Sequence, residues 1–88
     1  MKLSQQKKDK IAEQILSHLF HSSPNLLFTS EIAREIARDE EFTKSLLLDL
    51  RDKALVTAIK KNPKGKFYSR RIRWRLSNQA YQAYSKQV

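Results

Sequence analysis

The sequence predicts a small α+β domain that is mainly α, with three helices forming the core, then a short β-hairpin and a last helix. Apolar residues recur at helical spacing in three segments before residue 56. Residues 62–65 have the order Asn-Pro-Lys-Gly, which is typical of a type I turn, and residues 68–76 then alternate with period two. Because 88 residues suffice for one hydrophobic core, we expect a single domain over residues 1–88.

The first expected helix begins after Ser4, whose side chain suits an N-cap, and runs to about His21. Its inward residues recur at helical spacing, and they are Ile11, Ile15, Leu16, Leu19 and Phe20. Residues 22–25, a breaker cluster that contains Pro24, end this helix. Residues 26–28 then form either a brief strand or a buried connector.

The second and third helices follow closely on each other. Thr29 or Ser30 is expected to cap the second helix, which runs to about Arg38 and has its apolar stripe at Ile32, Ala33, Ile36 and Ala37. Asp39 is expected to cap the third helix. The residues expected to point inward from it are Phe42, Leu46, Leu47, Leu50 and Ala54.

The returning strand of the hairpin has two chemically different faces. One face is expected to carry Tyr68, Arg70, Ile72, Trp74 and Leu76, and the other Ser69, Arg71, Arg73 and Arg75. This alternation favours Trp74 as a core side chain over one that stacks on a base. Ser77 is expected to cap the last helix, in which Tyr81 and Tyr84 share a face. We expect that face to pack against the first helix, with a homodimer through this C-terminal helix as the alternative.

Composition argues against several classes of protein. The chain has no cysteine, and its longest uninterrupted apolar runs are three residues, so we expect a cytoplasmic protein with no membrane contact. Gly65 is the only glycine, which leaves no glycine-rich phosphate loop, and no spacing suggests a catalytic triad. His18 and His21 are three residues apart, but no cysteine or nearby acid completes a metal site. We therefore expect no enzyme activity, no cofactor and no metal.

Charge is unevenly distributed along the chain. The net charge is +9, and the last acid is Asp52; from Lys53 to Val88 there are ten basic residues and no acids. Residues 31–53 instead carry seven acids against five bases. The hairpin is therefore a candidate surface for a polyanion, and the preceding helices are not.

Three stretches together resemble the winged helix-turn-helix family of DNA-binding domains, in particular bacterial and archaeal transcriptional regulators. Residues 29–37 (TSEIAREIA) look like the first helix of the helix-turn-helix unit. Residues 47–56 (LLDLRDKALV) look like the end of a recognition helix that leads into the wing, and residues 74–77 (WRLS) look like the strand that closes the wing. The resemblance implies that the third helix approaches the major groove and that the basic hairpin is the wing.

Two features depart from that pattern. Ala37 and Ala54 stand where the family often has glycine, so two turns must be built without a residue that enters left-handed geometry freely. Residues 39–41 (Asp-Glu-Glu) place three acids at the start of the presumed recognition helix. Carboxylates there oppose phosphate, although a glutamate can accept a hydrogen bond from a cytosine amine.

The candidate nucleic-acid-binding residues come from the third helix and the wing. On the helix we expect Leu48 on the exposed face together with the polar candidates, with a buried Leu48 as the equal alternative. In the wing we expect contacts to phosphate, because a row of arginines with about 6.7 Å between alternate residues needs a counter-charge. The predicted residues are Thr43, Lys44, Ser45, Lys60, Lys61, Lys64, Lys66, Arg70, Arg71 and Arg73. Arg75 is a further candidate that could instead pair with Asp49 or Asp52. A solvated charged hairpin is the structural alternative.

Three functional hypotheses follow. The first is a DNA-binding transcriptional regulator or accessory protein that grips duplex DNA mainly through its wing. The second is a protein-interaction module, which the acidic start of the third helix favours if Glu40, Glu41 and Leu48 form an exposed surface. The third is RNA binding through the same basic wing.

Overall fold

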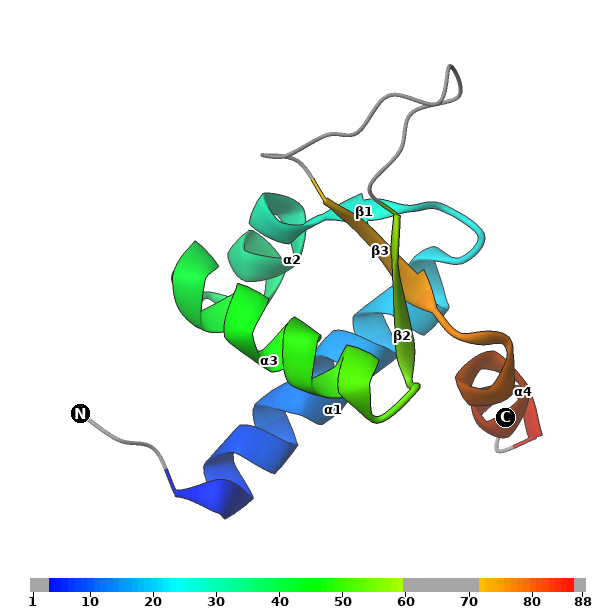
Figure 1. The fold of residues 1–88 in the computed structure, drawn as a ribbon, viewed down its shortest axis with the longest axis horizontal. Helices are drawn as coiled ribbons and strands as arrows, with labels where there is room; N and C mark the ends of the chain where they lie inside the picture. Colours follow the sequence, from blue (N-terminus) through cyan, green and yellow to red (C-terminus); the bar gives the residue numbers. More distant parts are fainter. Residues whose placement is uncertain (1–3, 60–71, 87–88) are drawn as a thin grey trace.

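The structure is a computed structural model that describes residues 4–59 and 72–86 (Figure 1). Within these ranges the chain forms four helices and three short strands. Their order is α1 (Gln5–Ser22), β1 (Leu27–Phe28), α2 (Thr29–Ile36), α3 (Glu40–Asp52), β2 (Val56–Ile59), β3 (Arg73–Leu76) and α4 (Asn78–Lys86). The predicted turn at residues 62–65 and the predicted strand residues before Ile72 lie outside the described residues. The mainly helical α+β class predicted from the sequence is confirmed.

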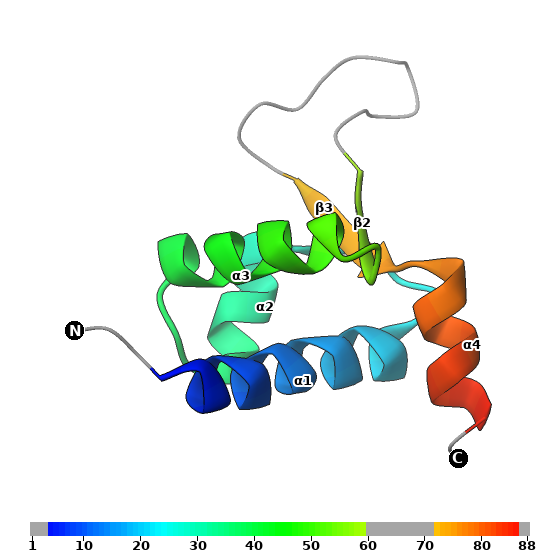
Figure 2. The ribbon, with the colours of Figure 1, turned by 60° about the horizontal axis from the view of Figure 1, so that its bottom comes forward.

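The three strands form one antiparallel sheet in the order β1-β3-β2, so β3 is its central strand. Leu27 of β1 and Ala58 of β2 flank Trp74 of β3, whereas Phe28 and Ile59 flank Arg73. Figure 2 shows α1 and α3 on opposite sides of α2, with α4 standing at the end where α1 finishes. Residues 26–28 were predicted to form either a brief strand or a buried connector, and they include the short strand β1.

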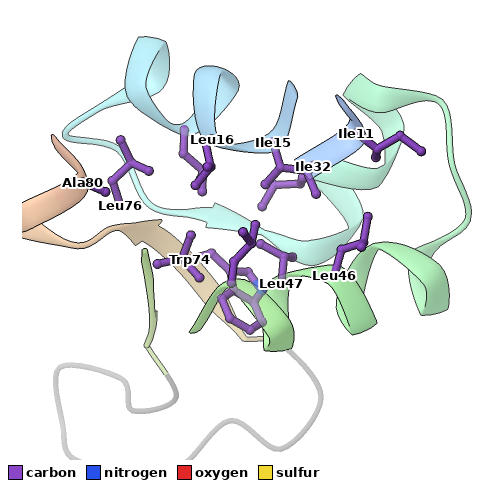
Figure 3. Close-up of a cluster of buried hydrophobic side chains, with 12 residues drawn as sticks. Ile11, Ile15, Leu16, Ile32, Leu46, Leu47, Trp74, Leu76 and Ala80 are labelled. Carbon is purple, nitrogen blue, oxygen red and sulfur yellow. The ribbon is translucent and has the colours of Figure 1, made fainter. Parts of the chain in front are cut away.

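The core lies between the helices and the inner face of the sheet. The labelled side chains of α1 point toward those of α3 in Figure 3, and Trp74 reaches into this space from β3. Trp74 has an exposed fraction of 0%, as do Ile15, Ile32 and Leu47. The prediction that Trp74 is a core side chain is confirmed.

Three helix caps predicted from the sequence are also confirmed. The Lys7 amide donates to Ser4 Oγ over 3.3 Å at the start of α1, and the Phe42 amide donates to Asp39 Oδ2 over 3.4 Å at the start of α3. At the start of α4 the Ala80 amide donates to Ser77 Oγ over 3.1 Å. Each side-chain oxygen satisfies a backbone donor that has no partner within its helix.

The predicted cap of α2 is wrong. The N-cap residue is Phe28, and Thr29 is the first residue of the helix. The Thr29 hydroxyl accepts a buried hydrogen bond of 2.8 Å from Trp74 Nε1, so it serves the sheet instead of the helix end. Glu31, in the first turn of α2, caps the helix start instead, because its Oε1 accepts a hydrogen bond of 2.9 Å from the Phe28 amide.

Both turns that follow α2 and α3 pass through an alanine in left-handed geometry. Ala37 has φ 57° and Ala54 has φ 62°, which the family's usual glycine would adopt without a steric penalty. For an alanine this geometry costs about 1–2 kcal/mol. Both residues were expected to point inward, and both are exposed instead, because α2 ends at Ile36 and α3 at Asp52.

The last helix docks on the end of α1 through aromatic rings. Phe20 stacks on Tyr84 with 5.6 Å between ring centroids and lies 5.3 Å from Tyr81. Burial, with a smaller contribution from Glu13, raises the pKa of the Tyr84 hydroxyl above its usual value. The predicted packing of this face on the first helix is confirmed, and Tyr81 keeps an exposed fraction of 42%.

No helix in the described residues is both long and apolar enough to span a membrane.

Candidate nucleic-acid interface

The two faces of β3 separate core residues from charged residues. Trp74 and Leu76 are buried on the inner face, and because successive side chains point to opposite faces, Arg73 and Arg75 lie on the outer face. Arg73 is half-buried and Arg75 is exposed. The period-two pattern predicted for residues 73–76 is confirmed, and it places two arginines side by side at the root of the hairpin.

Arg73 lies against an aromatic ring. Its guanidinium carbon is 5.8 Å from the centroid of the Phe28 ring, which belongs to the neighbouring strand β1 and is its partner in the sheet register. A cation–π contact of this kind contributes about 0.5–1 kcal/mol at an exposed site. Arg73 and Phe28 therefore lie together on the outer face of the sheet.

Arg75 borders a hollow at the other end of β3. The hollow has a volume of about 380 Å³ and is also lined by Pro24, Asn25 and Tyr81. Within residues 4–59 and 72–86, Arg75 forms no ion pair with Asp49 or Asp52, and Asp52 instead lies 3.6 Å from Arg51. The alternative in which Arg75 is neutralised by one of these aspartates is wrong for the described residues.

On α3 the structure corrects one predicted site residue. Thr43 was expected on the exposed face, but its exposed fraction is 0% and its hydroxyl donates to the Asp39 carbonyl over 2.8 Å. It precedes the buried Leu46 and Leu47 by three and four residues, so helical geometry places it on the core side. A buried threonine cannot contact a nucleic acid.

The other two predicted residues of α3 are accessible. Lys44 and Ser45 are exposed, and the Ser45 hydroxyl donates to the Phe42 carbonyl over 2.7 Å. Leu48 is half-buried and packs against the core, so it adds little to an exposed apolar surface. The helix as a whole carries four acids and two bases, with Glu40 and Glu41 exposed at its start.

Six of the predicted wing residues lie outside the described residues, and their role stays a prediction: Lys60, Lys61, Lys64, Lys66, Arg70 and Arg71. Sequence reasoning did not identify Phe28 as part of the site. The available signal was an aromatic residue directly before the Thr-Ser-Glu run, at a position where helix starts prefer Ser, Thr, Asp or Asn.

A second hollow of about 700 Å³ lies between α1 and the end of α2. His18 and His21 line it together with Glu13 and Glu35. The His21 Nδ1 donates to the Ser17 carbonyl over 2.7 Å, which orients that ring along its own helix. The described part of the chain contains no group of three side chains arranged to hold a metal ion.

Solved structures resemble this chain closely in backbone. A MepR mutant from a multidrug-resistant S. aureus clinical isolate has a TM-score of 0.71 and 18% identity, over 88% of this chain and 53% of that one. A ZitR mutant from Lactococcus lactis in the apo form has a TM-score of 0.64 and 13% identity, over 93% of this chain and 59% of that one. MepR and ZitR are winged-helix proteins.

The chain has a winged-helix fold.

A third winged-helix structure, a MepR mutant bound to an oligodeoxyribonucleotide, has a TM-score of 0.65 and 21% identity over 93% of this chain and 65% of that one. The chain spans about half the length of the chains that it matches, with 53% of the first MepR mutant and 48% of another ZitR mutant covered. No protein-family profile and no curated protein matches its sequence. In the winged helix β2 and β3 are the two sides of the wing, α2 and α3 form the helix-turn-helix pair, and Phe28, Arg73 and Arg75 lie at the wing root.

Proposed function

We propose that this winged-helix domain, taken as residues 1–88, binds duplex DNA as a transcriptional regulator or a DNA-associated accessory protein. The wing and its root contact the phosphate backbone, and α3 faces the major groove with Lys44 and Ser45. One observation carries the proposal: the outer face of β3 holds Arg73 and Arg75, and the segment that leads into it, residues 60–71, holds six bases and no acid.

Such a surface binds a polyanion through its charge. Each phosphate that a lysine or arginine neutralises releases condensed counterions, and this release supplies most of the affinity that does not depend on sequence. The similarity in fold to a MepR mutant that binds an oligodeoxyribonucleotide supports DNA as the polyanion. In the fold α3 contacts β2, and β2 pairs with β3, so we expect one duplex to reach both α3 and the wing.

The charge of α3 defines what kind of binding this is. Four acids against two bases give the helix a net charge of −2, so its approach to a duplex is opposed by its own carboxylates. Affinity then comes mainly from the wing side, and α3 contributes few base contacts. We expect binding that depends strongly on salt and only modestly on sequence.

Titration of a labelled duplex at several salt concentrations tests the proposal. We expect log K to fall linearly with log salt, by about 0.9 for each phosphate contact. A binding constant that does not change with salt, or no binding at low salt, would contradict it. Competition with duplex RNA and single-stranded RNA in the same assay separates DNA binding from RNA binding by the same wing.

A protein-interaction module is the second candidate, because Glu40 and Glu41 are exposed at the start of α3. Leu48 is half-buried, so such a surface is acidic with little apolar area, and it fits a basic partner. Capture of a partner that survives nuclease treatment and is lost in the variant Glu40→Gln with Glu41→Gln supports this function. The same variant should tighten duplex binding if α3 faces DNA.

A homodimer through α4 is a further part of the proposal. Tyr84 and Tyr81 already contact Phe20 within the chain, and the exposed part of Tyr81 is what a second copy can cover. Sedimentation equilibrium of the wild type and of Tyr81→Ser tests it. A wild type that stays monomeric at high concentration rules this dimer out.

A further inference from the structure

The hollow at the end of β3, which we call the Arg75 hollow, joins three segments that are distant in the sequence. Pro24 and Asn25 line it from the loop after α1, Arg75 from β3, and Asn78 and Tyr81 from the start of α4. Its volume of about 380 Å³ lies within the range of ligand sites in proteins, about 300–1,000 Å³. It is therefore large enough to receive part of a ligand.

The segments that form the Arg75 hollow contain no acidic residue. All of its lining residues belong to residues 14–30 and 53–88, and neither range has an aspartate or a glutamate. The larger hollow between α1 and α2 differs, because Glu13 and Glu35 line it. A recess whose charges have one sign concentrates ions of the opposite sign. Of these two hollows, the Arg75 hollow is the one suited to an anion.

The polar side chains of the Arg75 hollow have hydrogen-bonding capacity to offer. In the part of the chain that the structure describes, the side chains of Arg75, Asn25 and Asn78 make no hydrogen bond and no ion pair. All three residues are exposed. Arginine and asparagine side chains are among the groups that contact phosphate oxygens in protein–DNA complexes. The hollow thus offers one cation and two neutral donors to such a group.

Backbone hydrogen bonds hold the walls of the Arg75 hollow. The Asn25 amide donates to the Ser22 carbonyl over 2.9 Å, which fixes the loop after α1. The Ser77 amide donates to the Leu55 carbonyl over 3.0 Å, which fixes the chain between β3 and α4. Arg75 itself lies in the central strand of the sheet. Because these backbone positions are set before a ligand arrives, less conformational entropy is lost on binding.

We infer that the Arg75 hollow binds one phosphate group of the DNA backbone. Arg75 supplies the charge, and the side-chain amides of Asn25 and Asn78 donate to the phosphate oxygens. The hollow lies where β3 leads into α4, so a duplex held by the wing is also held beside α4 (Figure 2). This inference rests on the proposed function, and it adds two contact residues and the place of one phosphate.

The substitution Asn78→Asp tests the inference with almost no change in shape. It adds a negative charge to the hollow, and because α4 has no acid in its first turn, the new carboxylate should keep or raise the stability of the helix. We expect duplex affinity at about 0.1 M salt to fall about fivefold, because the carboxylate opposes the phosphate. The slope of log K against log salt should fall by about 0.9, since the carboxylate neutralises Arg75.

Gln79→Glu is the matched control. It adds the same charge to the same turn of α4, but Gln79 does not line the hollow. Duplex affinity should change by less than about twofold in this variant, because the added charge is screened from the phosphate. Asn25→Asp changes the hollow from the loop after α1 and should weaken binding as Asn78→Asp does. Thermal unfolding checks that all three variants are folded.

A double variant tests whether Asn78 and Arg75 contact the same phosphate. If they do, Asn78→Asp should weaken binding less in the Arg75→Ala background than in the wild type, because the contact is already lost. Fluorescence anisotropy with a labelled duplex measures both steps. Equal losses in the two backgrounds would show that these residues do not share a phosphate, and this would overturn the inference.

Failure of the proposed function and failure of this inference give different results. If the wild type shows no salt-dependent binding of duplex DNA, the proposed function is wrong and this inference with it. If the wild type binds as expected, but Asn78→Asp and Asn25→Asp bind as tightly as Gln79→Glu, only this inference is overturned.

Discussion

The inner and outer faces of β3 differ in burial and in charge. Trp74 and Leu76 on the inner face have exposed fractions of 0% and 4%, whereas Arg73 is half-buried and Arg75 exposed on the outer face. The inner residues contact the core, and the outer ones contact Phe28 or border a hollow. The difference predicts that stability and the proposed DNA binding can be changed independently within these four residues.

The largest effect is expected on the inner face. Trp74→Ala should lower the free energy of unfolding by about 3–5 kcal/mol, because it removes a fully buried ring and leaves a cavity. Urea denaturation measures this. Arg75→Ala on the other face is the matched control, with an expected change within about 0.5 kcal/mol. Equal losses for both variants would break the comparison.

The next effect concerns binding through the outer face. The double variant Arg73→Ala with Arg75→Ala should reduce the salt slope of duplex binding by about 1.8, since two phosphate contacts are lost. Its free energy of unfolding should fall by no more than about 1 kcal/mol, the value of the contact with Phe28. Fluorescence anisotropy over a range of salt measures the slope. An unchanged slope would show that this face does not meet the backbone.

The buried hydrogen bond between Trp74 and Thr29 sharpens the comparison of the two faces. Thr29→Val has nearly the same shape but leaves the Trp74 indole N–H buried without its acceptor, which should cost about 1–3 kcal/mol. Adding Trp74→Phe should cost less than the sum of the two single changes, because both partners are then gone. Thr57→Val, on the outer face, serves as the control with little expected effect. Additive losses in the cycle would mean that the bond contributes nothing.

Part of this arrangement could be predicted from the sequence, because it depends on local signals. The caps at Ser4, Asp39 and Ser77 are read from residues within one turn, and the alternation of residues 73–76 is itself the period of a strand. Such features need no knowledge of distant partners.

The rest was not predicted, for two different reasons. The role of Thr29 depends on Trp74, which is 45 residues away in the sequence. Thr43 was predicted on the exposed face because it remained after the apolar core residues of the helix had been assigned. It precedes the buried Leu46 and Leu47 by three and four residues, and the Asp39 carbonyl satisfies its hydroxyl. For Thr29 a contact distant in the sequence overrides the preference of the residue type, whereas the position of Thr43 follows from helical spacing alone.

The smallest effect comes from the two left-handed alanines, and it tests whether stability and binding are separate. Ala37→Gly and Ala54→Gly should each raise the free energy of unfolding by about 0.5–1 kcal/mol, since glycine relieves the steric cost but adds disorder to the unfolded chain. Thermal unfolding measures the gain. Duplex affinity and its salt slope should not change. A lower stability would show that these turns are not strained.

The central claim is that the outer face of the sheet at the wing root meets the nucleic-acid backbone. Amide chemical shifts of the labelled protein, followed while duplex DNA is added at low salt, test this most directly. We predict the largest shifts at Phe28, Thr57, Arg73 and Arg75, with little change at Lys10 and Gln14 on the outer side of α1. Largest shifts on α1 and α4, with the sheet signals unmoved, would contradict the claim.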